Sequence, residues 1–293
     1  MELEGTLIRG RGGFYTVVDR NGETWTLRCK KKFRRMGLSP LVGDEVRFTP
    51  GEGEEHGWLE EILPRRSQCL RPPVSNVSLL VILVSPAPAP DLLLVDRLLV
   101  RARQQQMEAL LVVSKGDLDP DLPAEISRQY AGAGVPVLPV CAATGQGLEA
   151  VREAMKGHLC CFTGQSGVGK STLLNALLGL ELETGEISQK ILRGKNTTRH
   201  AEMIIKDGLR VLDTAGFSLL EMEAGMEPIT LKDYYPEFAD HEGQCRFTPC
   251  YHDREPGCSV RQACEAGEIH PARLERYRVL LQEVKEAWRE RYD

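Results

Sequence analysis

The chain has 293 residues, 42% of them apolar and 27% charged, and this composition is typical of a water-soluble globular protein with more than one domain. Its net charge of −5 excludes a globally basic nucleic-acid-binding protein, so any such role has to come from local patches. No uncharged apolar run reaches the length of a membrane span and the N-terminus is acidic, so we expect a cytoplasmic protein without membrane contact.

Residues 1–72 carry five short runs in which apolar and polar residues alternate, separated by glycine-rich turns. This alternation predicts antiparallel strands, and five of them in this length predict an OB-fold β-barrel. Between two runs, residues 28–35 hold six positive charges around Phe33. On such a barrel this stretch could follow a nucleic-acid backbone while Phe33 or Phe14 stacks a base. The alternative is a solvated basic loop balanced by the acidic residues 52–61.

Residues 73–225 change to alternating strands and helices. The predicted elements of the first half are strands over 77–84, 109–113 and 135–141, and helices over 91–107 and about 123–132. The first strand is continuously apolar, which is typical of a parallel strand covered on both faces. The alternation predicts an α/β domain with a mainly parallel sheet.

The ends of the last two of these strands carry a base-reading signal. The earlier strand continues as Ser114, Lys115, Gly116 and Asp117. Lys115 and Asp117 have the spacing of a guanine-reading N-K-x-D motif, whose carboxylate accepts the ring N1–H and the exocyclic amine of guanine. Adenine has no N1–H, so a site of this kind rejects ATP. Ala142, after the later strand, resembles the alanine whose N–H contacts the guanine oxygen in such sites. The alternative is a solvated strand-to-helix turn.

A complete phosphate-loop pattern, G-x-x-x-x-G-K-[ST], follows an apolar strand and opens a helix. Its residues are Gly164, Gln165, Ser166, Gly167, Val168, Gly169, Lys170 and Ser171, with Thr172 next in the helix. Glycines let backbone N–H groups turn toward a β-phosphate, while the positive end of the helix dipole lies at the same point. Lys170 would reach the outer phosphates and Ser171 would offer its hydroxyl to Mg²⁺. The pattern therefore predicts a bound nucleoside triphosphate with Mg²⁺.

Two further segments complete a triphosphate site. Residues 194–200 form a candidate switch in which Thr198 would close over Mg²⁺ and the γ-phosphate. A later apolar strand ends in a D-x-x-G motif, in which Asp213 would hold Mg²⁺, mostly through water, and the Gly216 N–H would sense the γ-phosphate. Phe217 follows where Ras-type enzymes place a water-orienting glutamine, so intrinsic hydrolysis should be slow.

The order of these motifs is that of a circularly permuted GTPase. The base-reading pair precedes the phosphate loop, and the switch and D-x-x-G follow it, so the parts of one site appear in rotated chain order. Such a permutation preserves all buried contacts because the natural termini of a domain commonly lie close together on its surface.

Residues 226–293 contain a candidate zinc site and a terminal helix. Cys245, Cys250, His252 and Cys258 offer three thiolates and one imidazole within fourteen residues, a donor set that suits a closed tetrahedral Zn²⁺ site. Cys264 is the alternative fourth ligand. Two disulfides would use the same cysteines but are disfavoured in the cytosol. Apolar residues at helical spacing predict an amphipathic helix over 272–291, so this domain should be mostly helical.

With these motifs the chain resembles a known family over nearly its whole length, the ribosome small subunit-dependent GTPase A (RsgA/YjeQ) family. The strings that carry the resemblance are R-P at 71–72, V-D-R at 95–97, G-Q-S-G-V-G-K-S-T-L-L-N at 164–175, G-K-N-T-T-R at 194–199, D-T-A-G-F at 213–217 and C-x-x-x-x-C-x-H-x-x-E-P-G-C at 245–258. The resemblance implies a ribosome-activated GTPase that acts late in small-subunit maturation. Its barrel and zinc domain would contact rRNA on either side of the GTPase domain. Other assembly factors are further candidate partners, and we expect a monomer.

Three positions depart from the family pattern. Ser114 stands where the family usually has Asn, so the base loop should be looser and guanine selectivity weaker. Cys141 replaces the usual Ser. Asn196 replaces a His implicated in hydrolysis, and Asn can orient water but cannot transfer a proton at neutral pH. Asn196 therefore joins Lys170 among the candidate catalytic residues. The departures leave two alternatives open, a nucleotide-gated rRNA-binding module with negligible turnover and an ATP-using relative.

Overall fold

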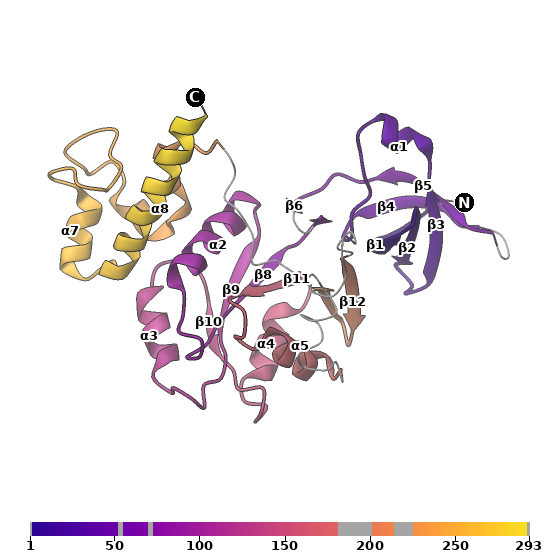
Figure 1. Cartoon of the computed structure of the whole chain (residues 1–293), viewed down its shortest axis with the longest axis horizontal. Helices are drawn as coiled ribbons and strands as arrows, with labels where there is room; N and C mark the ends of the chain where they lie inside the picture. The colour runs from indigo at the N-terminus through magenta and orange to yellow at the C-terminus, as the bar shows by residue number, and fades with distance from the viewer. Residues whose placement is uncertain (1, 52–54, 70–72, 181–200, 214–224, 292–293) are drawn as a thin grey trace.

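The computed structural model describes residues 2–51, 55–69, 73–180, 201–213 and 225–291. Along its longest axis lie an N-terminal barrel, a central α/β part and a C-terminal helical part (Figure 1). The domain boundaries predicted after residues 72 and 225 adjoin segments outside the described residues and stay predictions. No helix in the described part is long and apolar enough to cross a membrane.

The N-terminal part is a closed five-stranded barrel, as predicted. Its elements are β1 (Leu3–Arg11), β2 (Phe14–Asp19), β3 (Thr24–Cys29), the short helix α1 (Lys31–Arg35), β4 (Glu45–Thr49) and β5 (Gly57–Ile62). The strands pair in the order β1-β2-β3-β5-β4, and β4 returns to β1, which closes the barrel. Its interior is filled by alternate residues of each strand, including the fully buried Leu7, Val17, Leu27 and Leu59.

One prediction for the barrel is wrong. Phe33 does not stack a base, because it lies in α1 with only 4% of its surface exposed and belongs to the hydrophobic core. The basic stretch 28–35 is also not a loop, since it covers the end of β3 and the whole of α1. Phe14, the other candidate, is 36% exposed.

The central part is the predicted α/β fold. Its elements are β8 (Leu79–Val84), α2 (Leu92–Gln104), β9 (Glu108–Val113), α3 (Leu122–Gln129), β10 (Val137–Pro139), α4 (Leu148–Met155), β11 (Leu159–Gly164), α5 (Lys170–Leu178), β12 (Glu202–Lys206) and β13 (Leu209–Asp213). The strand order is β10-β9-β8-β11-β13-β12, parallel except for β12. Helices α2 and α3 pack on one face and α4 and α5 on the other, so β8 and β11 are buried along their whole length.

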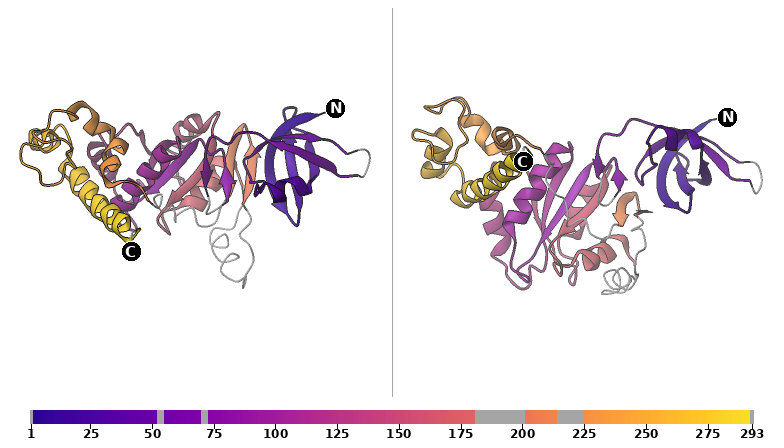
Figure 2. Two further views of the ribbon diagram at one scale, coloured as in Figure 1. Left: turned by 90° about the horizontal axis from the view of Figure 1, so that it is seen from above. Right: turned by 45° about the horizontal axis from the view of Figure 1, so that its top comes forward.

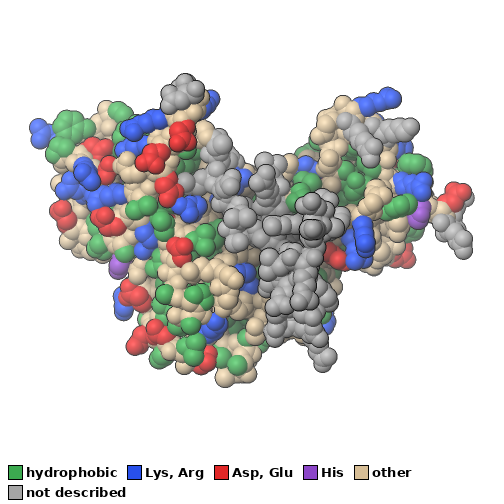
Figure 3. Space-filling view, viewed as in Figure 1, with side chains coloured by type: hydrophobic (Ala, Val, Ile, Leu, Met, Phe, Trp, Pro, Cys, Tyr) green, Lys and Arg blue, Asp and Glu red, His purple; other side chains and the backbone are tan. Residues whose placement is uncertain are grey.

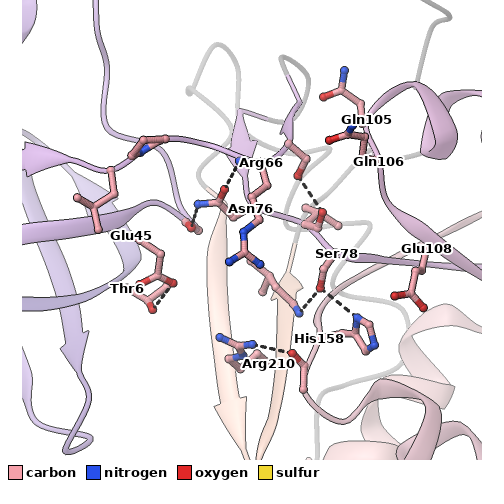
Figure 4. A pocket seen from close by; sticks show the side chains of 17 residues that line it. Thr6, Glu45, Arg66, Asn76, Ser78, Gln105, Gln106, Glu108, His158 and Arg210 are labelled. Carbon is pink, nitrogen blue, oxygen red and sulfur yellow. Dashed lines mark hydrogen bonds between the residues drawn. The ribbon is translucent and has the colours of Figure 1, made fainter.

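The barrel and the α/β part share one continuous sheet. Strand β1 pairs with β12 at a single register position, Arg9 with Glu202, and a small hairpin of β6 (Gln68–Cys69) and β7 (Val74–Ser75) joins the two parts. Beside this junction is a cavity of about 680 Å³ lined mainly by polar side chains (Figure 4). There Ser78 accepts the Leu159 N–H at 3.0 Å, and its hydroxyl lies 3.2 Å from Nδ1 of His158.

The C-terminal part packs against α2 and α3 (Figures 1 and 2). Its helices are η2 (Pro228–Tyr234), η3 (Pro236–His241), α7 (Ser259–Ala266) and α8 (Pro271–Glu290), so the predicted terminal helix is present and its apolar face is buried. A buried ion-pair cluster fastens α8 to α2: Arg273 lies 2.6 Å from Asp96 and 2.7 Å from Glu237, and Arg276 lies 2.8 Å from Asp96. Acidic and basic side chains are interspersed over the C-terminal and central parts of the face drawn in Figure 3.

Candidate nucleotide site and metal centre

The loops predicted to hold the nucleotide lie at the carboxyl ends of neighbouring parallel strands. Strand β11 runs into the phosphate loop, β9 runs into the base-reading loop, and β8 lies between them. In an open α/β sheet this edge is where ligands bind. Within the α/β part, the cavity described above is lined by residues at or just before the starts of β8, β9 and β11, so it is at the opposite end of the sheet.

Glycine is required at the start of the phosphate loop. Gly164 has φ +133°, and a Cβ there would lie 2.3 Å from the carbonyl oxygen of Leu83 on the neighbouring strand. Gly169, the residue before α5, has a left-handed conformation that turns the chain into the helix. The loop therefore brings the free N–H groups of the first turn of α5 to the carboxyl edge of the sheet. Ser171 lies half-buried in that turn, and Thr172 is exposed beside it.

Lys170 is folded back over the phosphate loop. Its Nζ donates to the carbonyl oxygens of Gly164 and Gln165, both at 2.7 Å. Burial lowers the pKa of Lys170, because the half-buried ammonium loses hydration and no carboxylate within the described residues compensates it. A phosphate group would supply that missing negative charge.

The base-reading loop is bonded directly to the phosphate loop. The buried hydroxyl of Ser114 lies 2.6 Å from the Val168 carbonyl oxygen and 3.2 Å from that of Val84. The Nζ of Lys115 donates to the Gly167 carbonyl oxygen at 2.7 Å. Two segments separated by about fifty residues of sequence thus form one structural unit.

Asp117 lies exposed at the far end of the base-reading loop. The Sγ of the buried Cys141 lies 3.5 Å from Oδ1 of Asp117, so the loops after β9 and β10 meet there. The Cys141 N–H donates to the Gln146 carbonyl oxygen at 2.9 Å, which closes the turn that carries Ala142. The predicted base-reading residues are therefore brought together on one side of the phosphate loop, with Gly116 between Lys115 and Asp117.

Several predicted site residues are not placed. Asn196, Thr198 and Gly216 lie outside the described residues, and only the backbone of Asp213 is described. That backbone ends β13, which pairs in parallel with β11, so Asp213 comes at the same edge of the sheet as the phosphate loop.

One contact at this site was not predicted. The Oε1 of Gln165 accepts the backbone N–H of Asp91 at 2.9 Å, and Asp91 in turn caps α2 by accepting the Leu94 N–H at 2.9 Å. The signal in the sequence is an Asp directly before a helical apolar pattern, which is a helix start signal. Through this contact the phosphate loop is joined to the beginning of α2.

The structure brings the four candidate zinc ligands together. The ligand atoms of Cys245, Cys250, His252 and Cys258 all lie within 4.8 Å of one another. Nδ1 of His252 is 3.3 Å from the Cys258 sulfur and 3.7 Å from the Cys245 sulfur. All nine cysteines are free thiols, which argues against the disulfide alternative, and Cys264 is not part of the cluster.

Neighbouring groups favour the binding of a metal ion by this cluster. Nε2 of His252 bonds to Oε1 of Glu242 at 2.8 Å, which leaves Nδ1 for the metal, an arrangement common at zinc sites. Burial raises the pKa of Cys250 to about 12. Burial acts in the same sense on Cys245, but the hydroxyl and N–H of Ser259 contact its sulfur and lower its pKa on balance. A cation would favour the thiolate form of Cys250 and Cys258, whose pKa values burial raises, so the donor set is compatible with structural zinc. Glu242 and Ser259 were not predicted.

Two family models match the chain. One, described as the RsgA GTPase, matches residues 62–223, and the other, described as the RsgA N-terminal domain, matches residues 4–59. The small ribosomal subunit biogenesis GTPase RsgA of Ruminiclostridium cellulolyticum is 41% identical over 288 residues, 96% of this chain and 94% of that protein. The protein of the same name from Moorella thermoacetica is 43% identical, over 96% of this chain and 97% of its own length.

Two solved structures are similar over nearly the whole chain. YjeQ from Thermotoga maritima superposes with a TM-score of 0.84 at 35% identity, covering 97% of this chain and 99% of that one. YloQ, described as a circularly permuted GTPase, superposes with a TM-score of 0.80 at 31% identity, covering 98% of this chain and 96% of that one.

Proposed function

The chain belongs to the RsgA GTPase family, and we propose on that basis that it is a GTP-hydrolysing enzyme of small-ribosomal-subunit biogenesis, slow alone and stimulated by the subunit. The observation that carries this proposal is the junction of the two loops. Ser114 and Lys115 bond to Val168 and Gly167, so a base reader and a phosphate binder that are far apart in the permuted sequence form one site.

In the proposed complex each loop has a separate task. The backbone N–H groups of residues 164–169 and the side chain of Lys170 bind the phosphates, and Lys170 exchanges its two carbonyl partners for phosphate oxygens. Asp117 accepts the N1–H and amine of guanine, the stem of Lys115 lies along the base, and the Ala142 N–H donates to the guanine oxygen. Ser171, Thr198 and Asp213 hold Mg²⁺, which neutralises phosphate charge when bound.

Hydrolysis transfers the γ-phosphoryl group to water. A water oxygen bonds to the γ-phosphorus while the bond to the β–γ bridging oxygen breaks, which gives GDP and phosphate. Lys170 and the N–H of Gly216 stabilise the charge on the phosphoryl oxygens, and Asn196 orients the water. Because an amide cannot accept the proton of that water at neutral pH, the rate without the subunit is low.

The zinc domain and the barrel provide the contacts to the subunit. One structural Zn²⁺, held by Cys245, Cys250, His252 and Cys258, fixes the loop between η3 and α7. The barrel and the zinc domain bind rRNA on either side of the GTPase domain, other assembly factors are further partners, and the protein acts as a monomer in the cytoplasm, where ribosomes are assembled.

The test is GTP hydrolysis by the purified protein with and without small ribosomal subunits. Wild type should turn over slowly and be stimulated strongly, Lys170→Ala should be inactive, and Asn196→His should gain activity. An unchanged rate with subunits, together with an active Lys170→Ala variant, would refute the proposal. The alternative, a nucleotide-gated rRNA-binding module with negligible turnover, predicts no single-turnover hydrolysis even with subunits.

A further inference from the structure

A row of alternating aromatic and cationic side chains crosses the outer surface of the barrel. In the strand pairing, Arg11 of β1 is opposite Phe14 of β2, Phe14 is opposite Arg28 of β3, and Arg28 is opposite Trp58 of β5. Directly paired residues point to the same face of a sheet. The order along the row is therefore Arg11, Phe14, Arg28, Trp58.

This row faces solvent because the neighbouring positions fill the barrel. Leu27 and Leu59, each adjacent in sequence to a member of the row, are fully buried. Since side chains alternate along a strand, Arg28 and Trp58 point outward. Phe14 and Trp58 are 36% and 44% exposed, although large aromatic side chains are usually buried in a monomer. Strand β3 lies on the side of the barrel away from the α/β part (Figure 1).

The Phe14 ring is held in place by its neighbours, and the Trp58 ring is accessible. The guanidinium of Arg28 lies 4.9 Å from the centroid of the Phe14 ring, and His56 contacts the same ring edge-on with a centroid distance of 4.8 Å. Within the described residues, the indole N–H of Trp58 has no hydrogen-bond partner and no ring packs on it. A planar group of a binding partner can therefore stack on the accessible Trp58 ring, next to the Phe14 ring.

The charge of this surface suits a polyanion. Among the described residues, no carboxylate is within ion-pair distance of Arg11 or Arg28. The carboxylate on the same face of β5, Glu60, is occupied by Lys30. Helix α1 begins two residues after β3 ends and adds the exposed Lys32 and Arg35.

We propose that the row Arg11, Phe14, Arg28 and Trp58 is a binding platform for unpaired RNA, on which bases stack on Trp58 and Phe14 while Arg11 and Arg28 contact the phosphates. This deepens the proposed function, on which it rests, because it assigns the barrel a single-stranded RNA segment rather than a duplex. Bases stacked inside a duplex have no free face for Trp58. The row crosses β1, β2, β3 and β5 between the β1–β2 and β4–β5 loops, and its centre on β2 and β3 is the region that OB-folds use for oligonucleotides.

The test is binding of the full-length protein to a fluorescently labelled single-stranded RNA of about 12 nucleotides, within the site sizes of OB-folds, and to the matching duplex. The single strand should bind more tightly. Trp58→Ala and Phe14→Ala should each weaken its binding roughly tenfold, by loss of one stacked base, while Trp58→Phe retains most of the affinity. Val279→Ala, which removes an equally exposed apolar side chain from α8, should have no effect.

The salt dependence of the RNA affinity distinguishes the contribution of base stacking from that of phosphate contacts. Arg28→Gln should reduce the slope of log affinity against log salt by about 0.7, the value for one phosphate contact to a single strand, whereas Trp58→Ala should leave the slope unchanged. Arg20→Gln is the matched control, because it removes one positive charge from the same barrel at an exposed turn outside the row.

Two outcomes would refute the proposal that this row binds unpaired RNA. One is unchanged single-strand binding by Trp58→Ala and Phe14→Ala, and the other is tighter binding of the duplex than of the single strand. If these variants bind RNA normally but lose affinity for whole subunits, the row contacts a ribosomal protein and the RNA proposal is wrong. Stimulation of GTP hydrolysis by subunits is measured separately on wild type. Its absence, with a functional platform, would refute the proposed function alone.

Discussion

The hydroxyl of Ser114 joins the two halves of the proposed nucleotide site, so its removal tests how the site is organised. It lies 2.6 Å from the carbonyl oxygen of Val168, a residue with no exposed surface. Ser114→Ala removes one neutral hydrogen bond and leaves that carbonyl without the donor, a loss of about 1–2 kcal/mol. Because 1.4 kcal/mol is about a tenfold change in affinity, a fluorescent GDP analogue should dissociate roughly 5- to 30-fold faster.

Stopped-flow dissociation of that analogue gives the rate directly. The matched control is Ser127→Ala, which removes a hydroxyl that donates to the Pro123 carbonyl oxygen at 2.8 Å on the surface of α3, away from the nucleotide loops. Ser114→Asn supplies an amide donor at the same place and should slow dissociation. If Ser114→Ala released the analogue as slowly as wild type and Ser127→Ala, the bond between the loops would contribute nothing to nucleotide binding and the reasoning would be refuted.

Four further changes have defined outcomes. Gly164→Ala places a Cβ 2.3 Å from the Leu83 carbonyl oxygen, so calorimetry should detect no GTP binding by a still folded chain. Phe33→Ala should lower the free energy of unfolding by about 3–5 kcal/mol in urea denaturation, while RNA binding of the folded protein stays unchanged. Asp96→Ala removes one of the two carboxylates that pair with the buried Arg273 and the ion-pair partner of Arg276, and should cost about 3–5 kcal/mol, measured in the same way. A strong chelator should lower the melting temperature of wild type but not of Cys258→Ser, which is already impaired in zinc binding.

The parts of the fold that could be predicted are those whose cause is local in sequence. The continuously apolar β8 and β11, the glycine positions of the phosphate loop and the zinc donor set within fourteen residues all depend on neighbours along the chain. Helix α2 ends at Gln104, earlier than predicted, because Gln106 adopts a positive φ of 54° that no helix continues. Strand β10 is shorter than predicted, since Pro136 and Pro139 supply no N–H to a ladder.

The features that could not be predicted depend on contacts between distant segments. Phe33 lies in a basic stretch whose composition predicts solvent exposure. In the structure, however, α1 directs this apolar side chain into the barrel core. The contact of Gln165 with Asp91 and that of His252 with Glu242 need the fold before the partners can be known. The aromatic and cationic row on the barrel likewise follows from strand register, which alternation alone does not fix.

The two outer parts are attached to the nucleotide site by different physical means. Helix α2 receives the Gln165 contact at its beginning and holds the C-terminal part through Asp96, Arg273 and Arg276, a cluster with Asp96 and Arg273 buried, whose separation would expose unpaired charges. The barrel is attached through one ladder position with β12 and through hydrogen bonds to the β6–β7 hairpin, among them the Ser75 hydroxyl donated to the buried Asp44 at 2.6 Å. Moving either outer part therefore breaks contacts of a buried carboxylate, Asp96 for the C-terminal part and Asp44 for the barrel.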